Sequence, residues 1–372
     1  MTDMQPRRRR RPALAMACVT VGVAMMMSAT VPATASGAET PGRRFKPMTY
    51  NVYLGANLQP LFGVTDPDEL MRRAAEVFAH VEEVDFNVRA AALAREIIDA
   101  DPDVVALQEV SLWGTAPLSN PRDITVRYDF LTILLDELTR QGAGYRAAVI
   151  NPTFSGQLPI GPTTLGLFTD RNAIIVRSDV PASELSIENP AQGTYQAAIT
   201  VPILDQTLAV RRGWASIDVH VRDRWYTVID THLEAFVPAI REAQVAELVG
   251  IVAAADHPVV LAGDLNVYPD GYRVVDAEEW QMFDSVGLVD SWVEAGEAPA
   301  FTAGQSDDLD DVPSALDNMV DFVLHDSGGT VEALEGSGHI AGEELDDRTN
   351  TVPALWPSDH AGVVVTLRAA AA

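Results

Sequence analysis

Apolar residues recur at helical spacing in the segment that follows Asp66. They lie three or four positions apart and so share one face of a helix, at Leu70, Ala74, Val77, Phe78 and Val81. Asp66 is a suitable N-cap, Pro67 suits the first helical position, and Glu69 follows three residues after the cap. The pattern therefore predicts an amphipathic helix that begins at Pro67.

Helical spacing and short apolar runs divide the rest of the chain into further elements. Helices are predicted over residues 87–99, 128–140 and 238–255. Strands are predicted over residues 48–54, 103–110, 145–150, 172–176, 213–221, 225–230, 259–262, 319–324 and 361–367. Strands separated both by helices and by other strands predict mixed sheets with helices outside them, which is a layered α/β domain. No convincing linker interrupts residues 48–372, so we expect one domain there.

One connection, residues 151–168, is rich in Gly and Pro but also apolar. We expect it to be a partly packed surface loop between two strands. Its apolar character also fits a lip that contacts a substrate or a membrane, because exposed apolar loops often bind something.

The first 35 residues have the composition of a secretory signal peptide. Five arginines, Arg7 to Arg11, precede the apolar segment 13–27, and the small residues Ala33 and Ala35 frame a cleavage site. An uncleaved anchor is the alternative, but the apolar segment is shorter than the roughly 20 residues that a spanning helix needs. We therefore expect a signal peptide over residues 1–35, a short lead over residues 36–47, extracellular secretion, and no stable membrane insertion after cleavage.

Charge and cysteine content limit the partners of the mature chain. Removing residues 1–35 takes five of the 26 basic residues and one of the 53 acidic ones, which leaves a net charge of −31. Such a charge argues against broad electrostatic binding to DNA or anionic lipid, although a local metal site can still recruit a phosphate. The only cysteine, Cys18, lies in the signal peptide, too early for a lipoprotein signal, so the mature chain has no disulfide.

Polar side chains stand where five apolar runs begin or end: Asn51, Glu109, His232, Asp264 with Asn266, and Asp359 with His360. Each alone has a structural explanation. Asp264 and Asn266, for example, can form an Asx turn, or share one face if the strand continues. Together they are more specific, because the strand ends of packed sheets can open onto one rim. Carboxylate and amide oxygens suit Mg²⁺, and the lack of cysteine argues against a structural zinc site.

These segments, in their order, resemble the endonuclease/exonuclease/phosphatase superfamily. The matching motifs are TYNVYLG (49–55), LQEV (107–110), DTHLEA (230–235), GDLN (263–266), MVDFVL (319–324) and SDHAG (358–362). The superfamily includes DNase I-like nucleases, abasic-site endonucleases, bacterial sphingomyelinases and inositol-polyphosphate phosphatases. The resemblance implies a four-layered α/β sandwich, in which two packed mixed β-sheets are flanked by helices.

The resemblance also implies a metal site. Glu109 would be the principal ligand, Asn51 would support it, and Asp359 would lie near the same ion. Mg²⁺ is the expected cofactor, with Mn²⁺ or Ca²⁺ as alternatives. The ion would polarise the phosphoryl oxygen and stabilise the leaving oxygen, so that no covalent intermediate is required.

The catalytic roles are carried over in the same way. His360 would be the general base that takes a proton from the attacking water, and Asp321 would orient it. Asp264 would position the nucleophile and Asn266 the phosphate, while His232 would donate to a phosphoryl oxygen. A histidine suits proton transfer near neutral pH, and an aspartate partner fixes its tautomer. One position departs from the family pattern, because Met319 stands where an arginine is frequent, two residues before Asp321.

The sequence thus predicts a secreted, metal-dependent phosphoesterase, and in particular a phosphodiesterase that uses in-line attack of water. The expected substrate is a phosphate ester, but the sequence does not decide its class. The alternatives are nucleic acid, as for a scavenging nuclease, and a phospholipid head group, as for a sphingomyelinase or phospholipase C. A phosphomonoesterase is a further alternative. The pairs Arg211 with Arg212 and Arg222 with Arg224 can form a local phosphate track, but we expect them to be solvated strand ends. A non-catalytic binding protein on the same fold is disfavoured, because the carboxylates and histidines are present. The oligomeric state is left open.

Overall fold

The computed structural model describes residues 44–268 and 277–369 of the 372-residue chain. The chain divides into two units, Met1–Thr40 and Pro41–Ala372, and all of the described residues belong to the second. The signal peptide predicted over residues 1–35 lies outside the described residues, as does the lead predicted over residues 36–47 except for its last four positions. Among the described residues, no helix is both long and apolar enough to cross a membrane.

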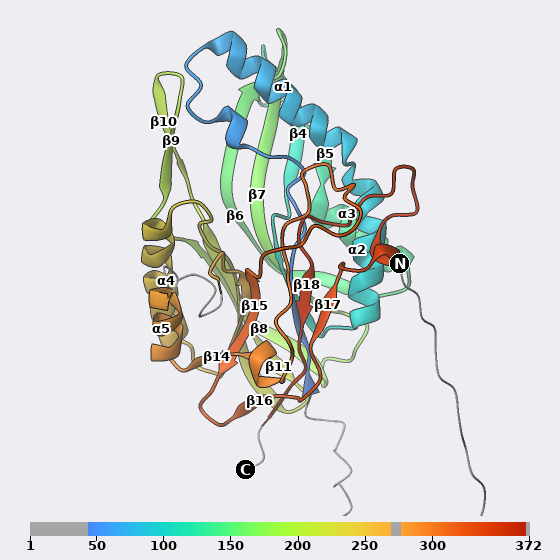
Figure 1. The fold of residues 1–372 in the computed structure, drawn as a ribbon, viewed down its shortest axis with the longest axis vertical. Helices are drawn as coiled ribbons and strands as arrows, with labels where there is room; N and C mark the ends of the chain where they lie inside the picture. Colours follow the sequence, from blue (N-terminus) through green and yellow to red (C-terminus); the bar gives the residue numbers. More distant parts are fainter. Residues whose placement is uncertain (1–43, 269–276, 370–372) are drawn as a thin grey trace, which may run out of the picture. The chain divides into compact units, whose positions relative to one another are not determined.

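Two mixed sheets form most of this unit (Figure 1). The larger has the strand order β17 (His339–Ala341), β18 (Gly362–Val364), β2 (Pro47–Asn51), β3 (Val104–Gln108), β7 (Thr164–Arg177), β4 (Leu112–Pro117) and β5 (Thr125–Asp129), and β6 (Tyr145–Pro159) also pairs with β7. The smaller has the order β14 (Leu288–Asp290), β15 (Asp321–Asp326), β13 (Val259–Asp264), β12 (Arg224–His232), β11 (Gly213–Val221) and β8 (Leu185–Thr194). Two minor sheets contain β1 (Arg44–Phe45), β19 (Leu367–Ala369) and β16 (Val331–Ala333), and the hairpin of β9 (Ile199–Ile203) and β10 (Gln206–Val210).

Strand β3 shows how the larger sheet separates two cores. Val104 and Ala106 pack into a core shared with the smaller sheet, whereas Val105 and Leu107 pack into a second core on the opposite face. Successive side chains of a strand point to opposite faces, so a strand that is apolar throughout is buried on both. The unbroken apolar run that predicted this strand therefore reflects its position between two layers.

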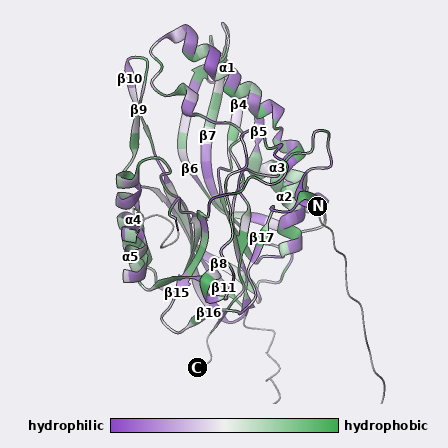
Figure 2. Cartoon of the chain, in the orientation of Figure 1, coloured by the Kyte–Doolittle hydropathy of each residue, from purple (hydrophilic) through white to green (hydrophobic). Residues whose placement is uncertain are grey.

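Helices cover the outer faces of both sheets. The core on the outer face of the larger sheet includes residues of α1 (Pro67–Glu83), α2 (Phe86–Ala100) and α3 (Phe130–Arg140). The inter-sheet core extends to α4 (Pro238–Ala253), α5 (Ala277–Ser285) and the short α6 (Ser291–Glu294). Figure 1 shows α4 and α5 on the opposite side of the sheets from α1, α2 and α3, and Figure 2 shows hydrophilic and hydrophobic turns alternating along α1. The predicted four-layered α/β sandwich is confirmed.

Helix α1 begins as its sequence predicts. The Asp66 side chain accepts hydrogen bonds from the backbone amides of Asp68 and Glu69, and Pro67 occupies the first turn. The five apolar residues predicted to share its inner face are all buried.

Some predicted element boundaries were wrong. Residues 151–168 are not a loop: they form most of a long hairpin between β6 and β7, whose turn spans residues 160–163. Its Pro and Gly are accommodated by irregular pairing, with register shifts near Ala147 and Pro152. The first long strand was predicted to reach Leu54 but ends at Asn51, because Tyr53 adopts a left-handed φ of 57°.

Buried polar bonds join the two sheets directly. Gln108 of β3 donates from Nε2 to Oδ1 of Asp230 in β12 at 2.7 Å, and Thr49 of β2 donates to Oε1 of the same glutamine at 3.2 Å. All three side chains are fully buried or nearly so. Since buried polar groups are costly unless paired, these bonds favour one relative register of the sheets.

Candidate active site

The polar residues predicted at strand ends lie in register on neighbouring strands. His232 at the end of β12 pairs with Asp264 at the end of the parallel strand β13, and Asp264 pairs with Asp321 at the start of the antiparallel strand β15. In the other sheet, β2 ends at Asn51 and β3 is followed directly by Glu109. Asn51 donates from Nδ2 to Oδ2 of Asp264 at 3.0 Å, so the strand ends of the two sheets meet.

Gly263 allows the strands to approach closely just before Asp264. A Cβ atom at this position would lie 2.1 Å from the backbone oxygen of Thr231 in the neighbouring strand. Only glycine fits there without displacement of the backbone. The glycine of the GDLN motif is thus explained by packing rather than by a turn.

His360 forms a pair with Asp321. Its Nδ1 lies 2.8 Å from Oδ2 of the aspartate, and its Nε2 lies 3.9 Å from Oδ2 of Asp264. Because Asp321 accepts at Nδ1, Nε2 is the nitrogen left for exchange with a substrate or water. Burial lowers the pKa of His360, but the carboxylates of Asp321, Asp359 and Asp264 outweigh it and raise the pKa well above its ordinary value.

His232 lies on the other side of Asp264. Its Nε2 is 3.4 Å from Oδ2 of Asp264, and its Nδ1 is 3.1 Å from Nη1 of Arg212. A guanidinium can only donate, so Nδ1 accepts and Nε2 carries the proton. Burial first, then Arg212 and His360, lower the pKa of His232 well below its usual value, which keeps the ring neutral.

Three carboxylates gather beside these histidines: Asp170, which is buried, and Glu109 and Asp359, which are half-buried. Burial, Asp359 and Asp170, in that order, raise the pKa of Glu109 to about 8, and burial also raises the pKa of Asp359 and of Asp170. Glu109 accepts a hydrogen bond from the backbone amide of Leu54 at 2.7 Å, and Oδ1 of Asp170 is buried without a partner among the described residues. A divalent cation bound to oxygen ligands would relieve the repulsion between these groups. The residues present therefore fit such an ion.

The structure brings together the predicted metal ligands, and a second acidic group beside them. Glu109 and Asp359 line the same cavity, while Asn51 is adjacent through its bond to Asp264. Oδ1 of Asn51 accepts from the amide of Tyr53 at 3.0 Å and keeps one lone pair. Ligand atoms of Asp264, Asp321 and His360 also lie within 4.8 Å of one another.

The backbone near the site is held in uncommon conformations. Tyr53, Glu109 and Asn266 adopt φ values of 57°, 59° and 49°, which non-glycine residues rarely do and which cluster at functional sites. The fully buried Arg89 donates to the carbonyl oxygens of Val52, Tyr53 and Pro357, among others, at 2.6 to 3.1 Å. It thereby ties the segment after Asn51 to the segment that carries the SDHAG motif.

The structure contradicts one of the two interpretations of Asp264 and Asn266, namely that they share one face of a continuing strand. Strand β13 ends at Asp264, so the two residues do not share a strand face. The amide of Asn266 instead donates to Oδ1 of Asp264 at 3.1 Å, which is the Asx turn, and its Nδ2 donates to the carbonyl of Leu233 at 3.1 Å. Met319, at the position where the family pattern often has arginine, packs into the apolar core, and Oδ1 of Asp321 is buried without a hydrogen-bond partner among the described residues.

Two residues of the site were missed by sequence reasoning. Arg212 was expected to be a solvated strand end, but it contacts His232 and lies 3.7 Å from Oδ2 of Asp170. Arg222, by contrast, is at a turn and pairs with Asp103, away from these residues. Asp170 follows an apolar hairpin segment that was interpreted as a loop, so neither residue had a distinct local signal.

Comparisons with known proteins agree with this fold. The sequence matches the Endonuclease/Exonuclease/phosphatase family over residues 48–360. An endonuclease/exonuclease/phosphatase family protein of Bacteroides thetaiotaomicron has a similar structure, with 17% identity, a TM-score of 0.55, and coverage of 88% of this chain and 98% of that one. A mannosyl-6-phosphatase of the same organism gives 15% identity, a TM-score of 0.53, and coverage of 87% and 99%. An endonuclease/exonuclease/phosphatase of Beutenbergia cavernae gives 20% identity, a TM-score of 0.51, and coverage of 89% of this chain and 72% of that one. At these identities the similarity establishes the fold alone. No match was found among curated proteins.

Proposed function

The chain belongs to the endonuclease/exonuclease/phosphatase family, and from this premise we propose that it is a divalent-metal-dependent phosphodiesterase that uses in-line attack of water. The observation that carries the proposal is the His360–Asp321 pair, at 2.8 Å, set beside Asp264 and the half-buried carboxylates Glu109 and Asp359. Members of this family are hydrolases of phosphate esters. The pair supplies a general base, and the carboxylates supply the oxygens for a cation.

His360 is the base in this proposal. Asp321 accepts a hydrogen bond from Nδ1, so that Nε2 takes a proton from the attacking water and the charged ring is stabilised by the carboxylate. Asp264, whose Oδ2 lies 3.9 Å from Nε2, orients that water. The pKa of Asp264 is raised to about 7 by burial and then by Asp321, which matches a group that shares protons near neutral pH.

His232 and Arg212 act on the phosphoryl group. His232 keeps Nε2 protonated because Arg212 donates to Nδ1, so Nε2 donates to a phosphoryl oxygen as negative charge develops. Arg212 adds a positive charge that lines the same cavity as Glu109 and Asp359. Asn266, held by Leu233, helps to position the phosphate.

Glu109, Asp359 and Asn51 would hold the ion, for which we propose Mg²⁺, with Mn²⁺ or Ca²⁺ as alternatives. When bound, the ion would act as a Lewis acid on the phosphoryl oxygen. The backbone amide of Leu54 donates to Glu109 at 2.7 Å and keeps this carboxylate in place. Nε1 of Trp113 in turn donates to the carbonyl of Leu54 at 2.8 Å.

Hydrolysis of bis(p-nitrophenyl) phosphate tests this proposal. We expect turnover with Mg²⁺, its loss in chelator, and a loss of at least about a hundredfold in kcat for Glu109→Gln and His360→Gln. Glu184→Gln, an exposed carboxylate on the β8 side of the smaller sheet, is the control and should leave the rate unchanged. Full activity in either site variant would exclude the assignment.

We also propose that the protein is secreted after cleavage of residues 1–35. The proposal rests on the arginine, apolar and small-residue order of that segment. N-terminal sequencing of the protein recovered from the culture medium tests it. Recovery only from cells, with residues 1–35 intact, would contradict it.

A further inference from the structure

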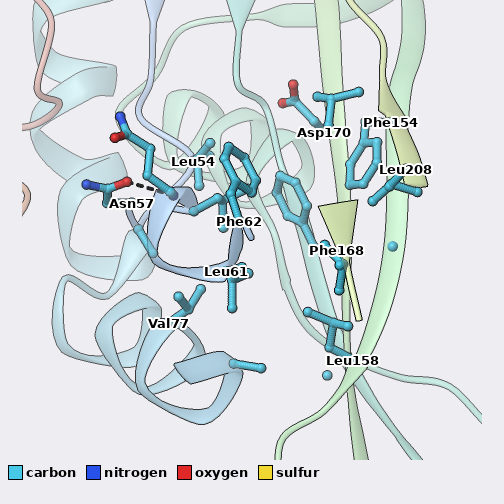
Figure 3. Close-up of a pocket in the computed structure, with 18 of the residues that line it drawn as sticks. Leu54, Asn57, Leu61, Phe62, Val77, Phe154, Leu158, Phe168, Asp170 and Leu208 are labelled. Carbon is cyan, nitrogen blue, oxygen red and sulfur yellow. Dashed lines mark hydrogen bonds between the residues drawn. The ribbon is translucent and has the colours of Figure 1, made fainter. Parts of the chain in front are cut away.

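An open cavity adjoins the proposed phosphate site. It has a volume of about 580 Å³, within the range of about 300–1,000 Å³ that is usual for small-molecule sites. The part of the cavity next to the proposed catalytic residues is lined by Glu109, Asp170, Arg212 and Asp359. Most of its other lining residues are apolar. In Figure 3, Asp170 lies at one end of the view and Leu158 toward the other, with Phe168 between them.

Four parts of the chain contribute apolar walls to the cavity. Helix α1 contributes Val77, the segment after Asn57 contributes Phe62, the β6–β7 hairpin contributes Leu158, and the β9–β10 hairpin contributes Leu208. Two rings also line the cavity and contact each other: Trp113 and Phe168 have centroids 4.5 Å apart and are tilted by 37°. Trp113 also donates to the carbonyl of Leu54. Aliphatic and aromatic side chains thus surround an open space that begins at the catalytic residues.

The charges that line the cavity limit its occupant to one phosphate. Arg212 is the only basic residue among the described residues that line it, whereas the acidic residues are Glu109, Asp170, Glu234, Asp307 and Asp359. A nucleic acid would bring several phosphates to an acidic wall, with no further cation to meet them. A molecule with one phosphodiester and a long apolar group would place its charge at Arg212 and its apolar part against the walls.

We propose that this cavity binds the aliphatic chain of an amphiphilic phosphodiester, so that the substrate class is a lipid-like phosphodiester taken up one molecule at a time. The inference rests on the proposed function, because it places the substrate phosphate at His360 and Glu109. Apolar surface that faces an open cavity is stabilised when an apolar group displaces water from it. Each methylene group that enters contributes to the free energy of binding in proportion to the apolar area it buries.

A series of alkyl p-nitrophenyl phosphodiesters tests the proposal. The methyl, butyl, octyl and dodecyl esters share one leaving group, and each is used with Mg²⁺ below its critical micelle concentration. We expect kcat/KM to rise by at least about a hundredfold from methyl to octyl, since a buried methylene is worth up to about fourfold. Equal kcat/KM across the series, or faster hydrolysis of a dinucleotide than of the octyl ester, would overturn the proposal.

Neighbouring residues of strand β10 provide matched variants. Leu208 lines the cavity and is half-buried, whereas Ala209 is exposed and does not line it. Leu208→Gln should lower the ratio of octyl to methyl kcat/KM at least about tenfold, and Ala209→Gln should keep the wild-type ratio. The same change of ratio in both variants would contradict a role for the cavity.

A binding measurement separates this inference from the proposed function. Dodecylphosphocholine is an amphiphilic phosphodiester, and its binding below the critical micelle concentration is compared by calorimetry with that of phosphocholine. We expect the dodecyl compound to bind at least about a hundredfold more tightly, and Leu208→Gln to weaken it. If no ester is hydrolysed but this preference holds, the function fails and the cavity assignment stands. Equal affinities, or adsorption to phosphatidylcholine vesicles without binding of the monomer, would overturn the cavity assignment.

Discussion

Nη1 of Arg212 lies 3.1 Å from Nδ1 of His232, and this contact determines which imidazole nitrogen faces Asp264. The guanidinium cannot accept a hydrogen bond, so the ring must present its protonated Nε2 to the site. The same Nη1 lies 3.7 Å from Oδ2 of Asp170, so a carboxylate also attracts this guanidinium. The arginine therefore orients a catalytic donor besides adding charge.

Loss of this contact should impair turnover more than folding. In Arg212→Met, Nδ1 of His232 is free to carry the proton, and Nε2 no longer donates to the phosphoryl oxygen. We expect kcat to fall by about a hundredfold, as for loss of a donor to a developing oxyanion. The ¹⁵N shifts of the His232 ring should report the changed tautomer. The control is Arg211→Met, because the neighbouring side chain is exposed and donates to the carbonyl of Tyr195. Equal losses in both variants would argue against the tautomer role.

The stability of the metal-free protein should fall as the pH rises. Burial and neighbouring carboxylates raise the pKa of Glu109 from 4.5 to about 8, so the folded state holds a proton that the unfolded state releases. This contribution is fully present below about pH 4.5 and is lost as the pH rises through the folded pKa of about 8. Calorimetry in chelator should therefore show a lower Tm at pH 8 than at pH 5.

Added Mg²⁺ should reverse that loss, because it binds the ionised carboxylate and displaces the proton. We expect a larger Mg²⁺-induced rise in Tm at pH 8 than at pH 5. Glu109→Gln removes the titrating group while keeping its shape, so its Tm should depend less on pH and respond less to Mg²⁺. An unchanged response in this variant would show that the ion binds elsewhere.

In the metal-free protein, the His360 ring should lose its proton at a higher pH than an ordinary histidine. Asp321 is the largest contribution that raises its pKa, against the lowering effect of burial. NMR titration in chelator should give a pKa above 6.5 for the wild type, and Asp321→Asn should lower it by at least about one unit, or 1.4 kcal/mol. Asp326→Asn, on the same strand, is the control. If Asp321→Asn left the titration unchanged, the aspartate would not be the partner of the ring.

The parts of the site that were predicted from the sequence are those with local signals. Glu109, His232 and Asp264 stand at the ends of apolar runs, whereas Asp321 lies within the run 319–324 and was predicted from the family resemblance. Strand pairing alone brings His232, Asp264 and Asp321 into register. The helix at Pro67 was predicted because capping and periodicity are local too. Such features follow from the order of a few neighbouring residues.

The parts that were missed depend on contacts between distant segments. Arg212 immediately precedes β11 and Asp170 belongs to β7, and their relation to His232 follows only from the packing of the two sheets. The cavity is a similar case, because its apolar walls come from α1, the segment after Asn57 and two hairpins. One of these hairpins contains the Pro- and Gly-containing segment that was predicted to be a loop. Periodicity gives no information on which elements enclose a common space.

Gly263 and Gly250 provide a test of close packing at the site, since the same substitution should have opposite effects. A Cβ at position 263 would lie 2.1 Å from the backbone oxygen of Thr231, which cannot move without separating β12 from β13. Gly263→Ala should therefore destabilise the fold by at least about 3 kcal/mol, the upper part of the range for overpacking, and displace Asp264. Gly250 lies within α4. Apart from its chain neighbours and the adjacent backbone of its own helix, no atom of a described residue would lie within 4 Å of a Cβ at this position. Gly250→Ala should raise the free energy of unfolding by about 0.5–1 kcal/mol, because alanine loses less conformational entropy in a helix. Urea denaturation measures both, and a Gly263→Ala midpoint equal to that of the wild type would contradict the close approach of the two strands.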